Sequence, residues 1–275
     1  MPELPEVETT CQALALYLKG QSIKKVDVYH NQLRSFLPEK FQLSLKDKEI
    51  IDVTRKAKYI VIRLSHGLIW ICHLGMSGSF ALRTQLQKPL KHDHIVVTTT
   101  QGTKIAYNDP RRFGMMDLIY ENQLMDYPLF KKLGPEPLDK KFNGKILEQI
   151  ISKKTGSIKS VLLDQTVVSG LGNIYVCESL FDAGILPQRI ASTIKNNEAQ
   201  KLALSIQKVL KKAIKAGGSS LKDYKKINGE LGYFQHQWAV YGKEGKACVK
   251  CKSKIGIMKI IQAGRSTYYC QKCQK

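Results

Sequence analysis

The 275-residue chain is poor in acidic residues, has only two tryptophans and contains no long uninterrupted apolar segment. Asp and Glu number 23 against 44 Lys and Arg, which leaves a formal net charge of +21. Most of this excess lies in residues 131–275, and it attracts polyanions. The longest apolar stretch, residues 59–74, includes Arg63, His66 and His73, so it cannot span a bilayer. The composition indicates a polyanion-binding protein that does not span a membrane.

The first six residues carry two acids and no basic or apolar region, so we expect no secretory signal. We therefore expect a cytoplasmic protein with reduced thiols. Hydrophobic residues make up 43% and charged residues 24% of the chain, ordinary values that exclude collagen-like and low-complexity classes. The length suffices for two compact domains, and a monomer is the default expectation.

The seven cysteines fall into two groups. Three are scattered among apolar residues, as buried cysteines often are. The other four form two Cys-x-x-Cys pairs separated by eighteen residues, a spacing typical of a tetrahedral zinc site. The alternative is a pair of disulfides or of redox Cys-x-x-Cys motifs, which a reducing compartment and the lack of a surrounding βαβ pattern disfavour. We predict one structural Zn²⁺, because four thiolates leave no open position for water, held by Cys248, Cys251, Cys270 and Cys273.

The pattern of apolar residues changes along the chain and predicts an α+β protein with several domains. A helix is expected from Pro5 to Gly20, because proline and acids favour a first turn and apolar residues mark one face. Short runs rich in β-branched residues then predict a β-sandwich or barrel. These runs are residues 22–29, 49–55, 59–64, 68–73, 94–100, 103–107 and 115–120.

A different pattern begins after residue 131. Residues 132–143 have the Pro and Gly density of a linker. Apolar residues then recur every three or four positions, which predicts helices as far as Gly217 and Gly218. We expect an N-terminal β-sandwich domain over 1–131, a helical domain over 144–238 and a zinc-binding β-hairpin over 239–275.

The second residue is proline, and a small residue there favours removal of Met1 and leaves a free secondary amine. Such an amine is a nucleophile that can form an iminium with a sugar carbon. Glu3 and Glu6 lie within about one helical turn and could move protons during sugar-ring opening. The alternative is that Pro2 simply starts the chain, which is the ordinary case for a proline at this position.

The N-terminal segment Met1–Thr9 resembles the signature of the formamidopyrimidine-DNA glycosylase family, the bacterial 8-oxoguanine repair enzymes called Fpg or MutM. Further motifs of that family follow in the same order and cover essentially the whole chain. They are residues 55–59, 73–78, 91–94, 108–114, 134–137 and 170–175, followed by the four-cysteine hairpin.

The resemblance implies a base-excision-repair DNA glycosylase with AP lyase activity. The amine of Pro2 would attack the anomeric carbon of an oxidised purine nucleotide, with Glu3 as the proton donor and Glu6 in support. The strand would then be cleaved by β,δ-elimination, with Lys58 as a proton donor for the first elimination and Arg265 in a similar role for the second. The partner would be damaged double-stranded DNA, which associates the protein with the bacterial nucleoid.

The resemblance also implies how DNA is held. A damaged nucleotide must be everted, and Met76, Arg111 and Phe113 match the side chains that fill the resulting hole. Without the motifs, core packing would be favoured for Met76 and Phe113. The loop Gly217–Tyr224 matches the segment that closes over the everted base, and the helical domain matches a helix-two-turn-helix. The remaining DNA contacts implied are His73, His92, Arg112, Lys154 and Asn173.

Two rival hypotheses stay open at this point. An enzyme of the endonuclease VIII type shares the proline chemistry but prefers oxidised pyrimidines, and Leu4 and the Gly217–Tyr224 loop favour the purine enzyme. A non-catalytic DNA-binding protein would explain the charge and the four cysteines. It would not explain the combination of Pro2, Glu3 and Lys58.

Overall fold

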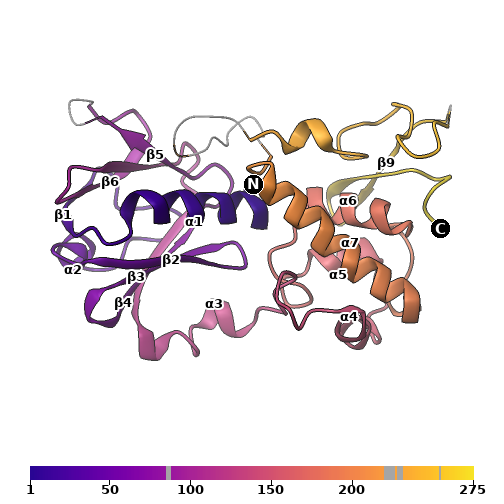
Figure 1. Ribbon diagram of the computed structural model, residues 1–275, viewed down its shortest axis with the longest axis horizontal. Coiled ribbons are helices and arrows are strands. Elements are labelled where there is room, and N and C mark those ends of the chain that lie inside the picture. Colours follow the sequence, from indigo (N-terminus) through magenta and orange to yellow (C-terminus); the bar gives the residue numbers. More distant parts are fainter. Residues whose placement is uncertain (85–87, 220–226, 228–231, 254) are drawn as a thin grey trace. The chain divides into compact units, whose positions relative to one another are not determined.

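A computed structural model describes the whole chain except residues 85–87, 220–226, 228–231 and 254. The chain forms two compact units, each with its own core. The first contains Met1–Lys131 and Ala216–Gln235, and the second contains Lys132–Lys215 and His236–Lys275. The predicted α+β class is confirmed, with an N-terminal helix, a β-sandwich, a group of helices and a C-terminal hairpin (Figure 1).

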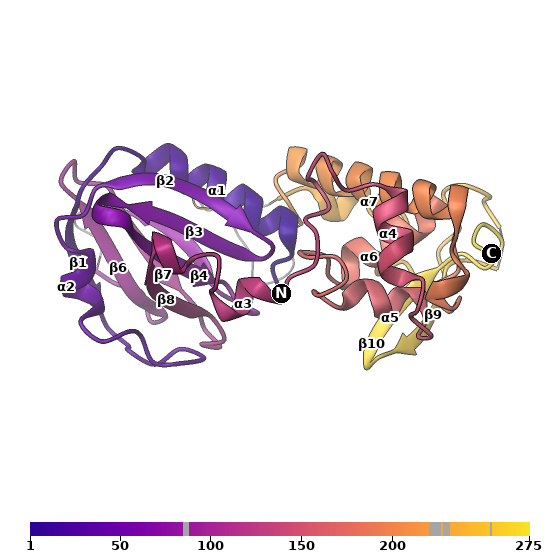
Figure 2. The ribbon, with the colours of Figure 1, turned by 90° about the horizontal axis from the view of Figure 1, so that it is seen from below.

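The N-terminal helix α1 (Leu4–Leu18) starts where the sequence predicts. Glu3 is its N-cap and forms a capping box with Glu6, while Pro5 stands in the first turn where its missing N–H costs nothing. Val7, Cys11, Leu14 and Leu18 recur on one face and are buried. This face packs against β2 and β3 of the sandwich (Figure 2).

The sandwich consists of two four-stranded antiparallel sheets (Figure 2). The first has the order β1-β6-β7-β5 and the second β2-β3-β4-β8. Trp70 lies in the shared core, edge-on to Phe80 with ring centroids 6.3 Å apart. The strands are β1 (Ile23–Val28), β2 (Ile50–Lys56), β3 (Tyr59–Leu64), β4 (Leu68–His73), β5 (Ser79–Arg83), β6 (Asp93–Thr99), β7 (Lys104–Asn108) and β8 (Met115–Tyr120).

One strand and two short α-helices of the first unit are not predicted by the sequence patterns. Strand β5 has five residues, of which only Phe80 is buried. Its alternation of apolar and polar residues is therefore too short to predict a strand. It exists because it pairs with β7 at the edge of the sheet. The short helices α2 (Phe41–Leu45) and α3 (Pro128–Lys131) each bury one or two apolar side chains and have no periodic signal of their own.

The described residues of the second unit form four α-helices and a β-hairpin. The helices are α4 (Gly144–Ile151), α5 (Ile158–Leu163), α6 (Asn173–Ala183) and α7 (Asn196–Lys215), and the hairpin strands are β9 (Met258–Gln262) and β10 (Arg265–Tyr269). Asn143 and Ser157 cap α4 and α5 with their side chains. Short 3-10 turns lie at Ser65–Gly67, Glu121–Gln123, Ala191–Thr193 and Phe234–Gln237. Within the part of the chain described, no helix combines the length and the apolar character needed to cross a membrane.

Candidate functional site

The start of α1 brings the predicted catalytic acids together. Pro2, Glu3 and Glu6 are all buried. The Glu6 carboxylate accepts hydrogen bonds from the backbone N–H of Glu3 and from that of Ser219, both at 2.8 Å. Two N–H groups and the positive end of the helix therefore stabilise a negative charge on Glu6. These two hydrogen bonds hold the start of α1 in place.

Lys58 lies in the tight turn between β2 and β3 and is 7% exposed. The Arg55 side chain fixes this hairpin, because its Nε donates to Glu8 of α1 at 2.9 Å and its Nη1 to the carbonyl of Ala57 at 3.0 Å. Ala57 has a positive φ of 52°, which the turn requires. The ion pair between Arg55 and Glu8 thus holds the turn that carries Lys58 against the first turns of α1.

His73, at the end of β4, is neutral at physiological pH. Burial and the nearby positive charges of Lys58 and Arg34 lower its pKa from 6.5 to about 4. Its Nδ1 accepts a hydrogen bond from the N–H of Gly75 at 3.0 Å, so its Nε2 carries the proton. The ring packs on Tyr59, with centroids 4.8 Å apart. His73 can act as a neutral hydrogen-bond donor.

Met76, Arg111 and Phe113 lie on two loops that contact each other. Met76 is 39% and Phe113 46% exposed, so core packing does not account for either. The Arg111 guanidinium lies over the Phe113 ring, 4.6 Å from its centroid. A side chain at Gly75 would overlap the backbone of Phe113, which places the two loops in direct contact. The structure thus brings these three predicted residues onto one surface of the first unit.

His92 and Arg112 line a basic hollow of about 720 Å³. Arg112 is hydrogen-bonded to His30, and Lys88 and Lys91 also line the hollow. His30 was missed by the sequence reading, since it belongs to no motif and reaches the hollow only because β1 pairs with β6. The concentration of cations indicates an anion-binding surface.

In the second unit, Asn173 and the β9–β10 hairpin are linked. Asn173 begins α6, and its Nδ2 donates to the carbonyl of Ser266 at 2.8 Å. Arg265 is exposed beside the turn of the same hairpin. Lys154 is also exposed, in the segment between α4 and α5.

Lys159 of α5 was missed by the sequence reading. It is fully buried, and its Nζ donates to the carbonyl of Gln262 in the hairpin at 3.2 Å. Burial lowers its pKa, and Arg265 contributes in the same direction. In the sequence, this supporting role is indicated only by the position of the lysine among the apolar residues of a short helix. Lys159 therefore supports the hairpin that carries Arg265.

Glu178 of α6 holds the start of the C-terminal segment. Its carboxylate accepts hydrogen bonds from three consecutive backbone N–H groups, those of Ala239, Val240 and Tyr241, at 2.8–2.9 Å. Cys177, beside it, packs in a small core with Phe181, Val240 and Ile257. This packing accounts for Cys177, for which the sequence indicated no function.

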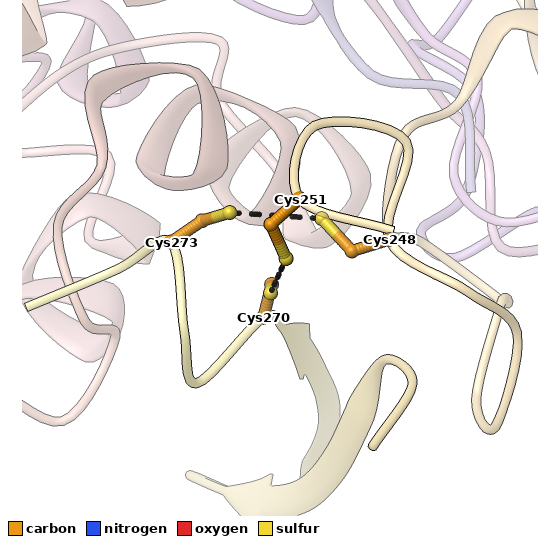
Figure 3. A group of neighbouring side chains, drawn as sticks. All are labelled: Cys248, Cys251, Cys270 and Cys273. Atoms are coloured by element: carbon orange, nitrogen blue, oxygen red, sulfur yellow. Dashed lines mark hydrogen bonds between the residues drawn. The ribbon is translucent and has the colours of Figure 1, made fainter. Parts of the chain in front are cut away.

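The four predicted metal ligands lie together, with all their sulfur atoms within 4.8 Å of one another (Figure 3). Cys248 and Cys273 are 3.8 Å apart and Cys251 and Cys270 3.6 Å apart, distances too long for disulfide bonds. Each Cys-x-x-Cys pair contributes one sulfur to each of these contacts. The cluster could hold a single metal ion.

The predicted loop Gly217–Tyr224 is described only as far as Ser219. Gly217 and Gly218 both have positive φ values of 76°, and Gly218 lies against Glu6. Residues 220–224 lie outside the described residues. The base of this loop thus belongs to the same site as the start of α1.

Comparison with known proteins agrees with these features. Residues 1–116 match the model of the formamidopyrimidine-DNA glycosylase N-terminal domain, and residues 133–225 match that of the formamidopyrimidine-DNA glycosylase H2TH domain. The chain is 47% identical to the formamidopyrimidine-DNA glycosylase of Rhodospirillum centenum and 43% identical to that of Azorhizobium caulinodans, with both chains covered completely in each case.

Solved structures give the same result. The chain superposes on a variant of Lactococcus lactis Fpg in complex with Fapy-dG containing DNA, with a TM-score of 0.92, 37% identity and complete coverage of both chains. It superposes on the Lactococcus lactis Fpg in complex with abasic-site DNA with a TM-score of 0.91, again at 37% identity and complete coverage. The family predicted from the motifs is therefore confirmed, and the chain belongs to the formamidopyrimidine-DNA glycosylase family.

Proposed function

We propose that this protein removes oxidised purines, such as 8-oxoguanine and formamidopyrimidines, from double-stranded DNA and then cleaves the strand at the resulting abasic site. The observation that carries the proposal is the buried arrangement of Pro2, Glu3 and Glu6 at the start of α1. Membership of a DNA glycosylase family supports it.

Removal of Met1 makes the nitrogen of Pro2 a secondary amine. This nitrogen bonds to C1′ of the damaged nucleotide as the bond from C1′ to the base breaks, and the base leaves with a proton. Glu3 protonates O4′ as the C1′–O4′ bond opens, which leaves an iminium between Pro2 and the sugar. Glu6, held by the N–H groups of Glu3 and Ser219, keeps the helix start in place for this step.

The iminium acidifies the sugar and makes two eliminations possible. Loss of the C2′ proton expels the 3′ phosphate, and Lys58 supplies a proton to the leaving group. Loss of the C4′ proton then expels the 5′ phosphate, with Arg265 in the corresponding role. The burial of Lys58 in a turn fixed by Arg55 supports an assignment that needs a positioned ammonium group.

We assign the DNA contacts to three groups of residues. Met76, Arg111 and Phe113 fill the space left by the everted nucleotide, with Arg111 facing the orphaned base. His73, His92 and Arg112 contact phosphates on the first unit. Asn173 and Lys154 do so on the second unit, and the net charge of +21 supports binding along the backbone.

We assign Zn²⁺ to the four-cysteine cluster. A tetrahedron of thiolates with Zn–S distances near 2.3 Å has sulfur atoms about 3.8 Å apart. The sulfur–sulfur separations of 3.8 and 3.6 Å fit this arrangement. Cys248, Cys251, Cys270 and Cys273 would all be ligands, so the ion would stabilise the β9–β10 hairpin and take no part in catalysis.

Borohydride trapping tests the proposal. Borohydride reduces an iminium to a stable amine, so an enzyme with a Pro2 nucleophile becomes covalently attached to its DNA. We expect an adduct with 8-oxoguanine opposite cytosine and with an abasic site. We expect none when the N-terminus is blocked by acetylation, and a much slower rate of trapping when Pro2→Gly replaces the secondary amine by a primary one. Pro38→Gly should keep full trapping.

Other outcomes would change the assignment. Trapping with dihydrouracil alone would place the protein with the endonuclease VIII type of enzyme. Trapping at the abasic site alone would leave a lyase without base recognition. Good DNA binding with no adduct on any substrate would favour a non-catalytic DNA-binding protein.

A further inference from the structure

A buried carboxylate lies directly beneath the exposed side chains of Met76, Arg111 and Phe113. Asp109 follows β7 and is 0% exposed, so it cannot itself contact DNA. It precedes the loop that carries Arg111 and Phe113, and it faces the loop that carries Met76. A buried aspartate needs several hydrogen-bond donors to offset the cost of its desolvation. The positions of these donors in the chain show which segments the carboxylate holds together.

Three groups donate to the Asp109 carboxylate. The hydroxyl of Ser77 donates to Oδ1 at 2.6 Å. The N–H of Gly114 and the hydroxyl of Tyr107 donate to Oδ2, at 2.8 and 3.1 Å. Ser77 directly follows Met76, and Gly114 directly follows Phe113. One carboxylate therefore fixes the backbone beside both exposed apolar side chains.

Ser77 adds a further connection between the loops. Its hydroxyl donates to Asp109 and at the same time accepts a hydrogen bond from the backbone N–H of Arg111 at 3.1 Å. Ser77 as a whole is only 4% exposed, so both hydrogen bonds of its hydroxyl are protected from water. The third exposed side chain, Arg111, is thus tied to the same group.

The remaining contacts leave this arrangement little freedom. A side chain at Gly114 would overlap the hydroxyl of Tyr107, so the backbone here must approach the tyrosine ring closely. The Asp109 carbonyl accepts from His94 Nε2 at 2.8 Å, and burial and Asp109 raise the pKa of Tyr107, which keeps its hydroxyl a donor. Rigid support matters because a side chain that enters DNA does so at lower entropic cost when its backbone is already fixed.

We propose that Asp109, acting through Ser77 and the backbone N–H of Gly114, is the positioning residue that holds Met76, Arg111 and Phe113 as one preformed wedge for entry into the DNA duplex. This inference rests on the proposed function, because the wedge has a role only if a nucleotide is everted. Asp109 contributes by holding the two loops in register and not by touching substrate.

Ser77→Ala tests this role with the smallest change, since it removes one hydroxyl and both of its bonds. The substrate is an abasic-site oligonucleotide, used either as a single strand or in a duplex opposite cytosine. Eversion and filling of the hole are needed only in the duplex. We expect the rate of borohydride trapping on the duplex to fall at least tenfold, and the rate on the single strand to change less than twofold.

Three further variants complete the test. Ser77→Thr keeps a hydroxyl and should restore most of the duplex rate, and Asp109→Asn should reproduce the duplex-specific loss. Ser65→Ala also removes a hydroxyl that accepts from a backbone N–H, that of Glu49, at a distant turn of the same unit. It should leave both rates unchanged. Fluorescence of 2-aminopurine placed opposite the abasic site should rise less with Ser77→Ala, since this signal reports unstacking and not chemistry.

The outcomes separate this inference from the proposed function. Equal losses on single strand and duplex, or unchanged rates in Ser77→Ala, would overturn the positioning role while the unaltered protein still forms its adduct. Absence of an adduct with the unaltered protein on either substrate would instead overturn the proposed function, and the positioning role with it.

Discussion

The carboxylate of Glu6 accepts a hydrogen bond from the backbone N–H of Ser219 at 2.8 Å, although 213 positions separate them in the chain. The same carboxylate accepts from the N–H of Glu3 at 2.8 Å. Glu6 therefore connects the helix start that carries Pro2 to the base of the Gly217–Tyr224 segment. A substitution in the 217–219 segment should therefore alter the position of the helix start, and a substitution at the helix start should alter that of the segment.

We expect Glu6→Gln to lower the rate of borohydride trapping at least tenfold. A glutamine offers one acceptor oxygen, so one of the two buried N–H groups would face an NH₂ group and lose its partner, which costs about 1–3 kcal/mol. The measurement is single-turnover trapping on duplex DNA that contains 8-oxoguanine. Glu49→Gln, at an exposed position of the same unit, serves as the control, and equal rates for all three proteins would exclude a connecting role for Glu6.

The ion pair between Arg83 and Asp93 should make the sandwich less stable at strongly acidic pH. Asp93 accepts two bonds from Arg83 at 2.8 Å and further bonds from Asn108 and Leu90. Burial alone would raise the Asp93 pKa, but these donors outweigh it and hold the pKa below the ordinary 3.8. Asp93→Asn should lower the free energy of unfolding by about 3–5 kcal/mol at neutral pH.

The pH dependence follows from the direction of that pKa. Because the folded pKa lies below the unfolded value, the stabilisation is fully present above pH 3.8 and is lost as the pH falls through the folded pKa. Urea unfolding between pH 3 and 6 measures it. Asp126→Asn removes an exposed pair with Lys131 and should change stability by less than about 1 kcal/mol. A comparable loss in both variants would contradict the prediction.

His73 should make the protein less stable at mildly acidic pH. Its folded pKa of about 4 lies below 6.5, so the unfolded chain takes up a proton first as the pH falls. The loss begins near pH 6.5 and is complete below about 4, where it corresponds to about 3 kcal/mol. We expect His73→Gln to flatten the stability curve between pH 4 and 6.5. His236→Gln, at an exposed position, should leave the curve unchanged, and a flat curve in the unaltered protein would contradict the burial argument.

Removal of the metal should unfold the C-terminal hairpin selectively. The unaltered protein is expected to contain one zinc ion per chain, measured by mass spectrometry, and Cys251→Ser to contain much less. Cys11→Ala, at a buried cysteine outside the cluster, should keep its zinc. Chelation should abolish hydrogen-exchange protection in residues 258–269 and leave the strands of the first unit protected, because the ion replaces a core that the hairpin lacks. Equal loss in both units would indicate that the cluster supports the whole fold.

Local patterns were sufficient to predict most helices and strands. Strands β3, β4 and β8 have the predicted bounds, because their β-branched runs end at clear turn residues. The four-cysteine cluster was also predictable from local spacing, because each Cys-x-x-Cys pair lies within one turn and the separation between the pairs suits a hairpin. Strand β5 was missed because pairing with β7, and not its own composition, makes it a strand. The roles of the individual site residues stay predictions until the variants are measured.

The sequence by itself determined the element types, the cysteine cluster and the family, because these depend on residues close together in the chain or on ordered motifs. Only the tertiary structure decided which buried polar groups support the site. Glu6 meets Ser219, Ser77 meets Asp109, and Lys159 meets Gln262 across separations of 213, 32 and 103 positions. No periodicity or motif spacing encodes such pairs. They arise because a buried charge or N–H must find a partner wherever the packed chain brings one within reach.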